Sequence, residues 1–313
     1  MRILFAERSN GPKAAALSVP DALARVRSET GLDLTAARAR LGFSRGHLLE
    51  IVVMSSSFGS ATDDRALDAA NLLVPLLVGE EVFDDWVGAI DVGPAPRGGS
   101  LRVLESGRTA PDPTLTLAEV RPAVEAAIRG VEAGLPGTPY HRTSDGAEWT
   151  LLEAEPEVAT GDRDGCADDY PALGDLVLLS TRLPEAMKCL LQGSRFSSCR
   201  FSKHGERFVY VKVDGAGLGA DARYALRLSI EHALDGALKE PDLGVVVGAG
   251  IGARYVYVVL SLASVEDGVR AACSALRARG VPRRAWLLPC DSEHDGEWVP
   301  VWEDSPGPPR SAP

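Results

Sequence analysis

The residues best suited to chemistry lie in one segment where cations alternate with aromatic rings. Between residues 195 and 208, arginine stands directly before phenylalanine three times. Guanidinium groups beside aromatic faces can bind a phosphate, a carboxylate or an unstacked base. The alternative is a connector whose phenylalanines pack on a neighbouring core while its cations stay in solvent. The spacing matches no established motif and favours this connector. The candidate ligand-binding cations are Arg195, Arg200, Lys203, His204 and Arg207.

A glycine cluster, Gly248, Gly250 and Gly252, separates two apolar runs within residues 243–260. A dinucleotide-binding fingerprint requires a strand before such glycines and a helix directly after them. The residues after Gly252 are instead rich in valine and tyrosine, which favour a strand. We therefore predict an antiparallel hairpin in which residues 254–260 pair with residues 243–247. Because glycine lets a backbone approach a ligand closely, the three glycines stay candidate ligand-binding residues.

Metal and nucleophile chemistry has little support in the sequence. Cys189 lies near Cys199 and His204, and Cys290 lies near His294, but neither set has the paired spacing of a tetrahedral zinc site. The histidines are scattered, and neither a phosphate-binding loop nor a serine-nucleophile motif occurs. We predict no metal site, no cofactor and no catalytic residues.

Composition narrows the classes of function. The chain has 313 residues, of which 45% are hydrophobic and 25% charged, as in globular proteins, and its net charge is -11. Such a charge disfavours broad binding to nucleic acids or membrane surfaces, which requires a field of lysine and arginine. The five cysteines do not suggest a disulfide framework, and no apolar run is long enough to span a bilayer. Residues 1–7 are too short and too soon charged for a signal-peptide core, so we predict a cytoplasmic protein.

Hydrophobic periodicity predicts the elements that would position these residues. A helix is expected at residues 34–41, within a short N-terminal extension. The first half then follows the order strand, helix, strand, strand, helix, strand, at residues 48–54, 62–78, 87–92, 101–104, 116–134 and 149–154. A capping box, Thr116 with Glu119, opens the second of these helices.

The same order returns in the second half, at residues 208–213, 221–239, 243–247, 254–260, 264–280 and 284–288. A charged stripe on the helix at 221–239 is expected to face solvent, and consists of Arg223, Arg227, Glu231, Asp235 and Lys239. We therefore predict an α+β protein of two tandem ferredoxin-like (βαββαβ) sandwich domains with antiparallel sheets. The expected parts are an N-terminal extension (1–45), a first domain (46–156), an acidic then basic connector (157–205), a second domain (206–302) and a disordered tail (303–313).

Three functional hypotheses follow, because this architecture alone does not specify a function. The leading one is a non-catalytic binding or regulatory protein, which recognises a small ligand or a protein partner near the interface of its two domains. The second is an RNA-binding or RNA-processing protein that uses residues 195–208. The third is an enzyme of unidentified class, with His204 or His294 as its acid-base group.

Overall fold

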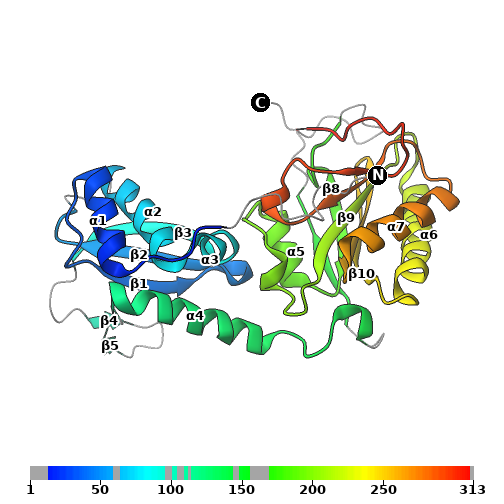
Figure 1. Cartoon of the computed structure of the whole chain (residues 1–313). Helices are drawn as coiled ribbons and strands as arrows, with labels where there is room; N and C mark the ends of the chain where they lie inside the picture. Colours follow the sequence, from blue (N-terminus) through cyan, green and yellow to red (C-terminus); the bar gives the residue numbers. More distant parts are fainter. Residues whose placement is uncertain are drawn as a thin grey trace. The chain divides into compact units, whose positions relative to one another are not determined.

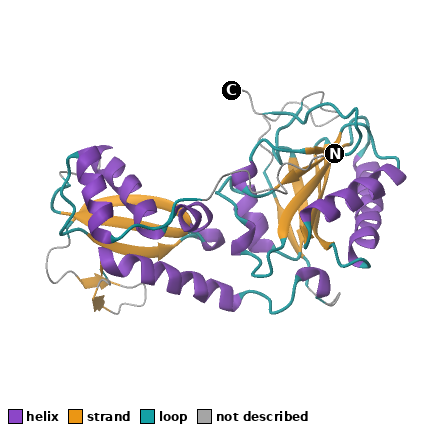
Figure 2. Cartoon of the chain, viewed as in Figure 1, coloured by secondary structure: helices purple, strands orange, loops and turns teal. Residues whose placement is uncertain are grey.

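The computed structural model describes residues 13–58, 64–95, 101–103, 109–111, 114–143, 148–155 and 169–310. Helices make up 41% of it and strands 25%, which is the mixed content of the predicted α+β class. Chain contacts divide it into two compact units, an N-terminal unit (Asn10–Gly134) and a C-terminal unit that begins at Leu135. Figures 1 and 2 show the elements of each unit. Within the described residues, no helix is both long enough and apolar enough to cross a membrane.

The N-terminal unit combines helices with a four-stranded sheet. Its elements are α1 (Val19–Thr30), β1 (Arg38–Phe43), β2 (Leu49–Ser55), α2 (Asp64–Val78), α3 (Glu80–Trp86), β3 (Val87–Pro94), β4 (Leu101–Val103), β5 (Thr109–Pro111), β6 (Leu115–Thr116) and α4 (Leu117–Gly134). The predicted capping box is confirmed, because the backbone N–H and the hydroxyl of Thr116 donate to Glu119 Oε2 over 2.7 and 2.8 Å.

The helix predicted at residues 34–41 is wrong. Residues 38–43 form β1, which pairs antiparallel with β2 along its whole length, from Arg38 opposite Met54 to Phe43 opposite Leu49. The alanines and arginines of this stretch are good helix formers, but intrinsic propensity is a weak preference, and pairing with an apolar neighbouring strand outweighs it.

The antiparallel ferredoxin-like sheet predicted for the first half is not found in the N-terminal unit. The strand order is β3-β2-β1-β6, and β2 and β3 run parallel across the crossover that α2 and α3 provide. The predicted third strand is β4, which pairs with β5 in a separate two-stranded sheet. The predicted fourth strand is β7 (Thr150–Glu153), which pairs with β8 (Leu176–Thr181) in the C-terminal unit.

The C-terminal unit is built on one seven-stranded sheet in the order β13-β12-β9-β11-β10-β8-β7, with every neighbouring pair antiparallel. Beside β7 and β8, its elements are α5 (Pro184–Leu191), β9 (Arg207–Asp214), α6 (Ala220–Lys239), β10 (Gly244–Gly252), β11 (Tyr255–Leu262), α7 (Val265–Ala278), β12 (Ala285–Pro289) and β13 (Val299–Pro300). The helices and strands predicted from residue 208 to residue 288 are confirmed. The predicted glycine hairpin is confirmed too, because β10 and β11 pair antiparallel from Gly244 opposite Leu262 to Ile251 opposite Val256.

Both faces are buried along the central strands of this sheet, each by a different core. Side chains alternate between the two faces along β9. The valines at 209, 211 and 213 lie in the core beneath α6 and α7. Phe208 and Tyr210 lie in an aromatic core on the opposite face. α6 and α7 lie side by side on the first face, and α5 lies on the other (Figure 1). Because neither face meets water, β9, β10 and β11 are almost continuously apolar.

The chain beyond β13 packs on the aromatic face of the sheet. Trp286 Nε1 donates to the carbonyl of Pro306 over 2.5 Å, and Ser305 is 9% exposed. Ser305 and Pro306, within the segment 303–313 predicted to be a disordered tail, are therefore packed on the sheet. Residues 311–313 lie outside the described part of the chain.

Candidate ligand-binding site

The phenylalanines of the segment 195–208 pack as the connector interpretation predicts. Phe196, Phe201 and Phe208 are at most 4% exposed and belong to the aromatic core. The rings of Phe196 and Phe201 stack with centroids 5.1 Å apart, and Phe208 meets Phe196 edge-on at 6.1 Å. These rings face inward, away from any ligand on the surface of this segment.

The cations of this segment serve the unit's own structure. Arg200 is completely buried, contrary to the expectation that it stays in solvent, and its Nη2 donates to the carbonyl of Arg195. Lys203 Nζ donates to the Leu135 carbonyl over 2.9 Å, and His204 Nε2 lies 3.1 Å from the Pro136 carbonyl oxygen.

Arg207, the last candidate cation of the segment, forms ion pairs within the unit. Its Nη1 lies 3.4 Å from Asp291 Oδ1 and 3.8 Å from Glu293 Oε1. The carboxylate of Asp291 also accepts from the backbone N–H and the hydroxyl of Ser198, over 2.6 and 2.7 Å. These bonds tie the start of β9 to the segment after β12.

His294, the other histidine of the enzyme hypothesis, is buried between two carboxylates. Its Nδ1 lies 3.4 Å from Glu297 Oε1, and its Nε2 lies 3.6 Å from Glu293 Oε1. Among the described residues, no group of three or more His, Cys, Asp or Glu side chains could hold a metal ion. Cys189, Cys199, Cys273 and Cys290 are free thiols.

The three candidate glycines lie inside β10, where each allows a neighbour to approach closely. A Cβ at Gly250 would stand 2.6 Å from the Leu178 carbonyl oxygen of β8, and a Cβ at Gly252 would collide with the Asp175 carboxylate. Gly250 also lines a pocket on the sheet face that carries α6. The glycines therefore allow close packing of β8 and the loop before it, and one of them borders a possible ligand site.

This pocket, called the α6 pocket below, has a volume of about 340 Å³. It lies between α6 and the strands β7, β8 and β10. Its lining consists of Trp149, Leu151, Leu178, Ser180, Tyr224, Arg227, Glu231, Ala249, Gly250 and Ile251. Trp149, Leu151 and Tyr224 are among the most exposed large apolar side chains of the described residues, and Leu151 reaches 59%. Exposed apolar groups gathered in a concave surface are typical of a binding site.

Two charged side chains of α6 stand in the wall of the α6 pocket. Arg227, on the stripe predicted to face solvent, is only 9% exposed, which corrects that prediction. Its Nη1 lies 3.3 Å from Glu231 Oε2 and 3.5 Å from the Ala249 carbonyl oxygen, and its guanidinium stacks 4.8 Å from the Tyr224 ring centroid. Arg227 Nε and Glu231 Oε2 are buried and have no hydrogen-bond partner among the described residues.

Two other pockets, of about 260 and 430 Å³, lie on the aromatic face of the sheet. They share Pro171, Ala172 and Tyr210. Neither has a buried arginine and a glutamate of one helix side by side in its wall, which distinguishes the α6 pocket.

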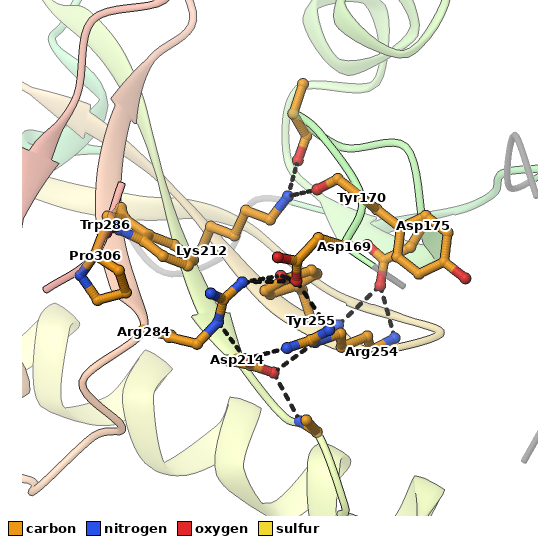
Figure 3. A network of polar contacts seen from close by, with 12 residues as sticks. Asp169, Tyr170, Asp175, Lys212, Asp214, Arg254, Tyr255, Arg284, Trp286 and Pro306 are labelled. Atoms are coloured by element: carbon orange, nitrogen blue, oxygen red, sulfur yellow. Dashed lines mark hydrogen bonds and ion pairs between the residues drawn. The ribbon is translucent and has the colours of Figure 1, made fainter. Parts of the chain in front are cut away.

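A network of polar side chains lies where the β10–β11 hairpin turns (Figure 3). Asp175, completely buried, is its anchor. Its Oδ2 accepts from the backbone N–H groups of Arg254 and Tyr255 over 2.7 and 2.8 Å, and its Oδ1 accepts from the Tyr257 hydroxyl. One carboxylate thus fixes the hairpin turn against the loop before β8.

Two arginines join two further aspartates in the same network. Asp214 accepts from Arg254 Nε and Nη2 over 2.9 and 2.7 Å, and from Arg284 Nε over 2.7 Å. Asp169 accepts from the Tyr255 hydroxyl over 2.8 Å and from Arg284 Nη2 over 2.6 Å. Burial pushes the pKa of Asp214 upward, but the hydrogen bonds from Arg254 and Arg284 outweigh it and hold that pKa below its usual value.

Lys212 completes the network from inside the aromatic core. It is 0% exposed, and its Nζ donates to the carbonyls of Tyr170 and Ala172, the latter over 2.7 Å. The ammonium also lies 4.2 Å from the ring centroid of Tyr255. Burial lowers the pKa of Lys212 to about 8, although Asp175 and Asp169 oppose the shift. Ala172 has a φ of 41°, which L-residues rarely adopt, so these bonds hold a strained loop.

The network is a structural clamp in which three aspartates balance three cations. Lys212 lies in the wall of none of the three pockets described here. Every charged member has a hydrogen-bond partner within the unit, so the network holds the loop at residues 169–175 on the hairpin. We therefore place the candidate ligand site at the α6 pocket.

Sequence reasoning missed the residues that matter most here. Arg227 and Glu231 were identified only as members of a solvent-facing stripe, and Trp149 was assigned to the first domain. The alternation of the strand could have identified Lys212. Residues 208, 210 and 212 point to the same face, and a lysine there follows two aromatic residues. No protein-family model, no curated protein and no solved structure matches the chain.

Proposed function

We propose that the protein is a non-catalytic binding protein whose small ligand lies in the α6 pocket of the C-terminal unit. One observation carries this proposal. An apolar pocket with aromatic walls is lined by two charged side chains, the buried Arg227 and the partly exposed Glu231, and each has a polar atom without a hydrogen bond within the described chain. Buried polar atoms in folded proteins are normally satisfied, by protein, water or ligand.

The pocket has the features expected of a ligand site. Its volume of about 340 Å³ lies within the usual range for small-molecule sites. Most of its lining is apolar, with few polar groups to orient a ligand. A ligand position near the interface of two domains, the finer part of our sequence-based hypothesis, stays a prediction.

We further propose that residues 206–302 form a ferredoxin-like domain, enlarged at both edges of its sheet. The element order β9-α6-β10-β11-α7-β12 supports this, as does the antiparallel run β12-β9-β11-β10. β8 and β7 extend the sheet beyond β10, where they form one wall of the α6 pocket.

The two alternative functions have less support. For RNA binding, the phenylalanines of residues 195–208 are buried and unable to stack on bases, and Arg200 is buried with them. For an enzyme, His294 contacts carboxylates, and His204 bonds to the Ser202 hydroxyl only through its backbone N–H, while its ring faces a carbonyl. Both stay untested hypotheses.

A thermal-shift screen with a panel of small molecules tests the binding proposal. Ligands of the folded state raise the melting temperature by mass action. Leu151→Ala should reduce the shift, because Leu151 lines the pocket. Val177→Ala is the matched control, since Val177 is an exposed apolar residue of neighbouring β8 that is absent from the lining. A silent panel, or equal losses in both variants, would contradict a ligand in this pocket.

A further inference from the structure

The polar groups of the α6 pocket indicate the charge pattern of its ligand. Arg227 lines the pocket with a guanidinium whose Nη1 lies 3.3 Å from Glu231 Oε2 and makes a long contact, 3.5 Å, with the Ala249 carbonyl. A carboxylate is the natural partner of such a fork of N–H donors. The stacking of Arg227 on Tyr224 fixes the plane of the guanidinium in advance.

Glu231 lies one turn further along α6 and offers the opposite charge. Its Oε2 lies 3.3 Å from Arg227 Nη1, yet this oxygen accepts no hydrogen bond within the described chain. The Glu231 side chain is 21% exposed, so an ammonium group in the pocket can reach this carboxylate. A ligand with a single negative charge would be repelled by it.

The rest of the pocket wall is apolar. Leu151, Leu178 and Ile251 come from three neighbouring strands and Trp149 directly precedes the first of them; together they surround a space large enough for an isobutyl or benzyl group. A ligand without charges would fill this space but would form no charge-assisted hydrogen bond with Arg227 or Glu231.

We propose that the α6 pocket binds a free α-amino acid with an apolar side chain. Its carboxylate lies on Arg227, its ammonium group on Glu231, and its side chain against Trp149 and Leu151. This inference rests on the proposed ligand-binding function, and it adds the class of ligand.

Four probes that share a phenyl group separate the contributions. They are L-phenylalanine, phenylpropionate without the ammonium group, phenethylamine without the carboxylate, and phenylpropanol with neither. Isothermal titration calorimetry on the full chain should find L-phenylalanine bound about tenfold more tightly than phenylpropionate or phenethylamine, the value of one charge-assisted hydrogen bond, and about a hundredfold more tightly than phenylpropanol, which lacks both charges.

Substitutions then assign each charge to its partner. Glu231→Gln should weaken L-phenylalanine about tenfold and should not weaken phenylpropionate, which no longer meets a like charge, while Arg227→Met should weaken both and spare phenethylamine. Asp235→Asn is the matched control, because Asp235 stands one turn beyond Glu231 on α6 and does not line the pocket. Circular dichroism spectra confirm that each variant is folded.

The outcomes separate this inference from the proposed function. Equal affinity for L-phenylalanine and phenylpropanol, or no effect of Glu231→Gln on L-phenylalanine, overturns the amino-acid ligand but leaves a pocket that binds apolar molecules. The wild-type probe series decides the question even where a variant fails to fold. If none of the four probes binds while the wider panel yields another ligand sensitive to Leu151→Ala, the ligand class is wrong and the binding function stands. If the panel is silent too, both fail.

Discussion

The buried ammonium of Lys212 should make the stability of the C-terminal unit depend on pH in an unusual direction. Its pKa is lowered to about 8, while the unfolded chain keeps the ordinary value of 10.5. Between these two values the unfolded state binds a proton that the folded state has released. Stability therefore rises with pH across this window, because the state that binds more protons is penalised as protons become scarce.

The size of the effect follows from the same two pKa values. Each tenfold difference in proton affinity between the two states corresponds to about 1.4 kcal/mol. From about pH 7 to about pH 9.5 the Lys212 contribution to stability should therefore increase by about 2 kcal/mol. Other groups titrate there as well, so the useful quantity is the unfolding free energy of the wild type minus that of Lys212→Met. This difference should increase by about 2 kcal/mol over that range.

Urea unfolding at several pH values and constant ionic strength measures this difference. Four of the five tryptophans lie in the C-terminal unit, and a Trp86→Phe background makes the fluorescence report that unit alone. Lys188→Met is the control, since Lys188 is exposed and pairs with Glu185 on the surface of α5. Free energies for the wild type and Lys212→Met that change in parallel with pH would refute the reasoning.

Two glycines and one cysteine of the same unit give further predictions about its unfolding free energy. Gly252→Ala should destabilise the protein by about 1–3 kcal/mol in urea unfolding, because the new Cβ would collide with the Asp175 carboxylate. Gly236→Ala should instead stabilise the protein by about 0.5–1 kcal/mol, because Gly236 lies inside α6 with open space around it. Equal effects of the two substitutions on the unfolding free energy would contradict the packing described. Burial raises the pKa of the Cys273 thiol to about 11 from 9.0. Its contribution to stability is present below about pH 9 and should fall by about 1 kcal/mol by about pH 10, relative to Cys273→Ala; no change in that difference would show that the thiol is not buried.

The fold of the C-terminal unit was predictable because its local signals agree with one another. Ser264 caps α7, and the valine- and tyrosine-rich run after Gly252 leaves no room for a helix. In the N-terminal unit, the secondary structure that the local sequence favours differs from the one that contacts with other strands stabilise. Residues 38–43 have little strand character of their own and become a strand only through pairing with β2. Likewise, β7 has a clear strand pattern, but nothing in that pattern tells which sheet it joins.

The candidate site was harder to predict than the fold, because it depends on which sheet edge lies beside which helix. Arg227 and Glu231 follow the spacing of a solvent-exposed ion pair, and only the addition of β8 and β7 to the sheet encloses them. The segment at residues 195–208 has the more conspicuous pattern of cations and rings, but it does not form the candidate site. Its phenylalanine rings and Arg200 are buried in the interior of the unit. A local pattern identifies a side chain's chemistry, while long-range pairing decides whether a ligand can reach it.

The most direct test of the ligand site is the indole N–H region of a nitrogen-15 NMR spectrum during titration with L-phenylalanine. The chain has five tryptophans, and among them only Trp149 lines the α6 pocket. Its signal, assigned with Trp149→Phe, should shift progressively to saturation while those of the other four stay in place. Trp298 lines a pocket on the opposite face of the sheet, so a shift of its signal without one at Trp149 would contradict a ligand in the α6 pocket.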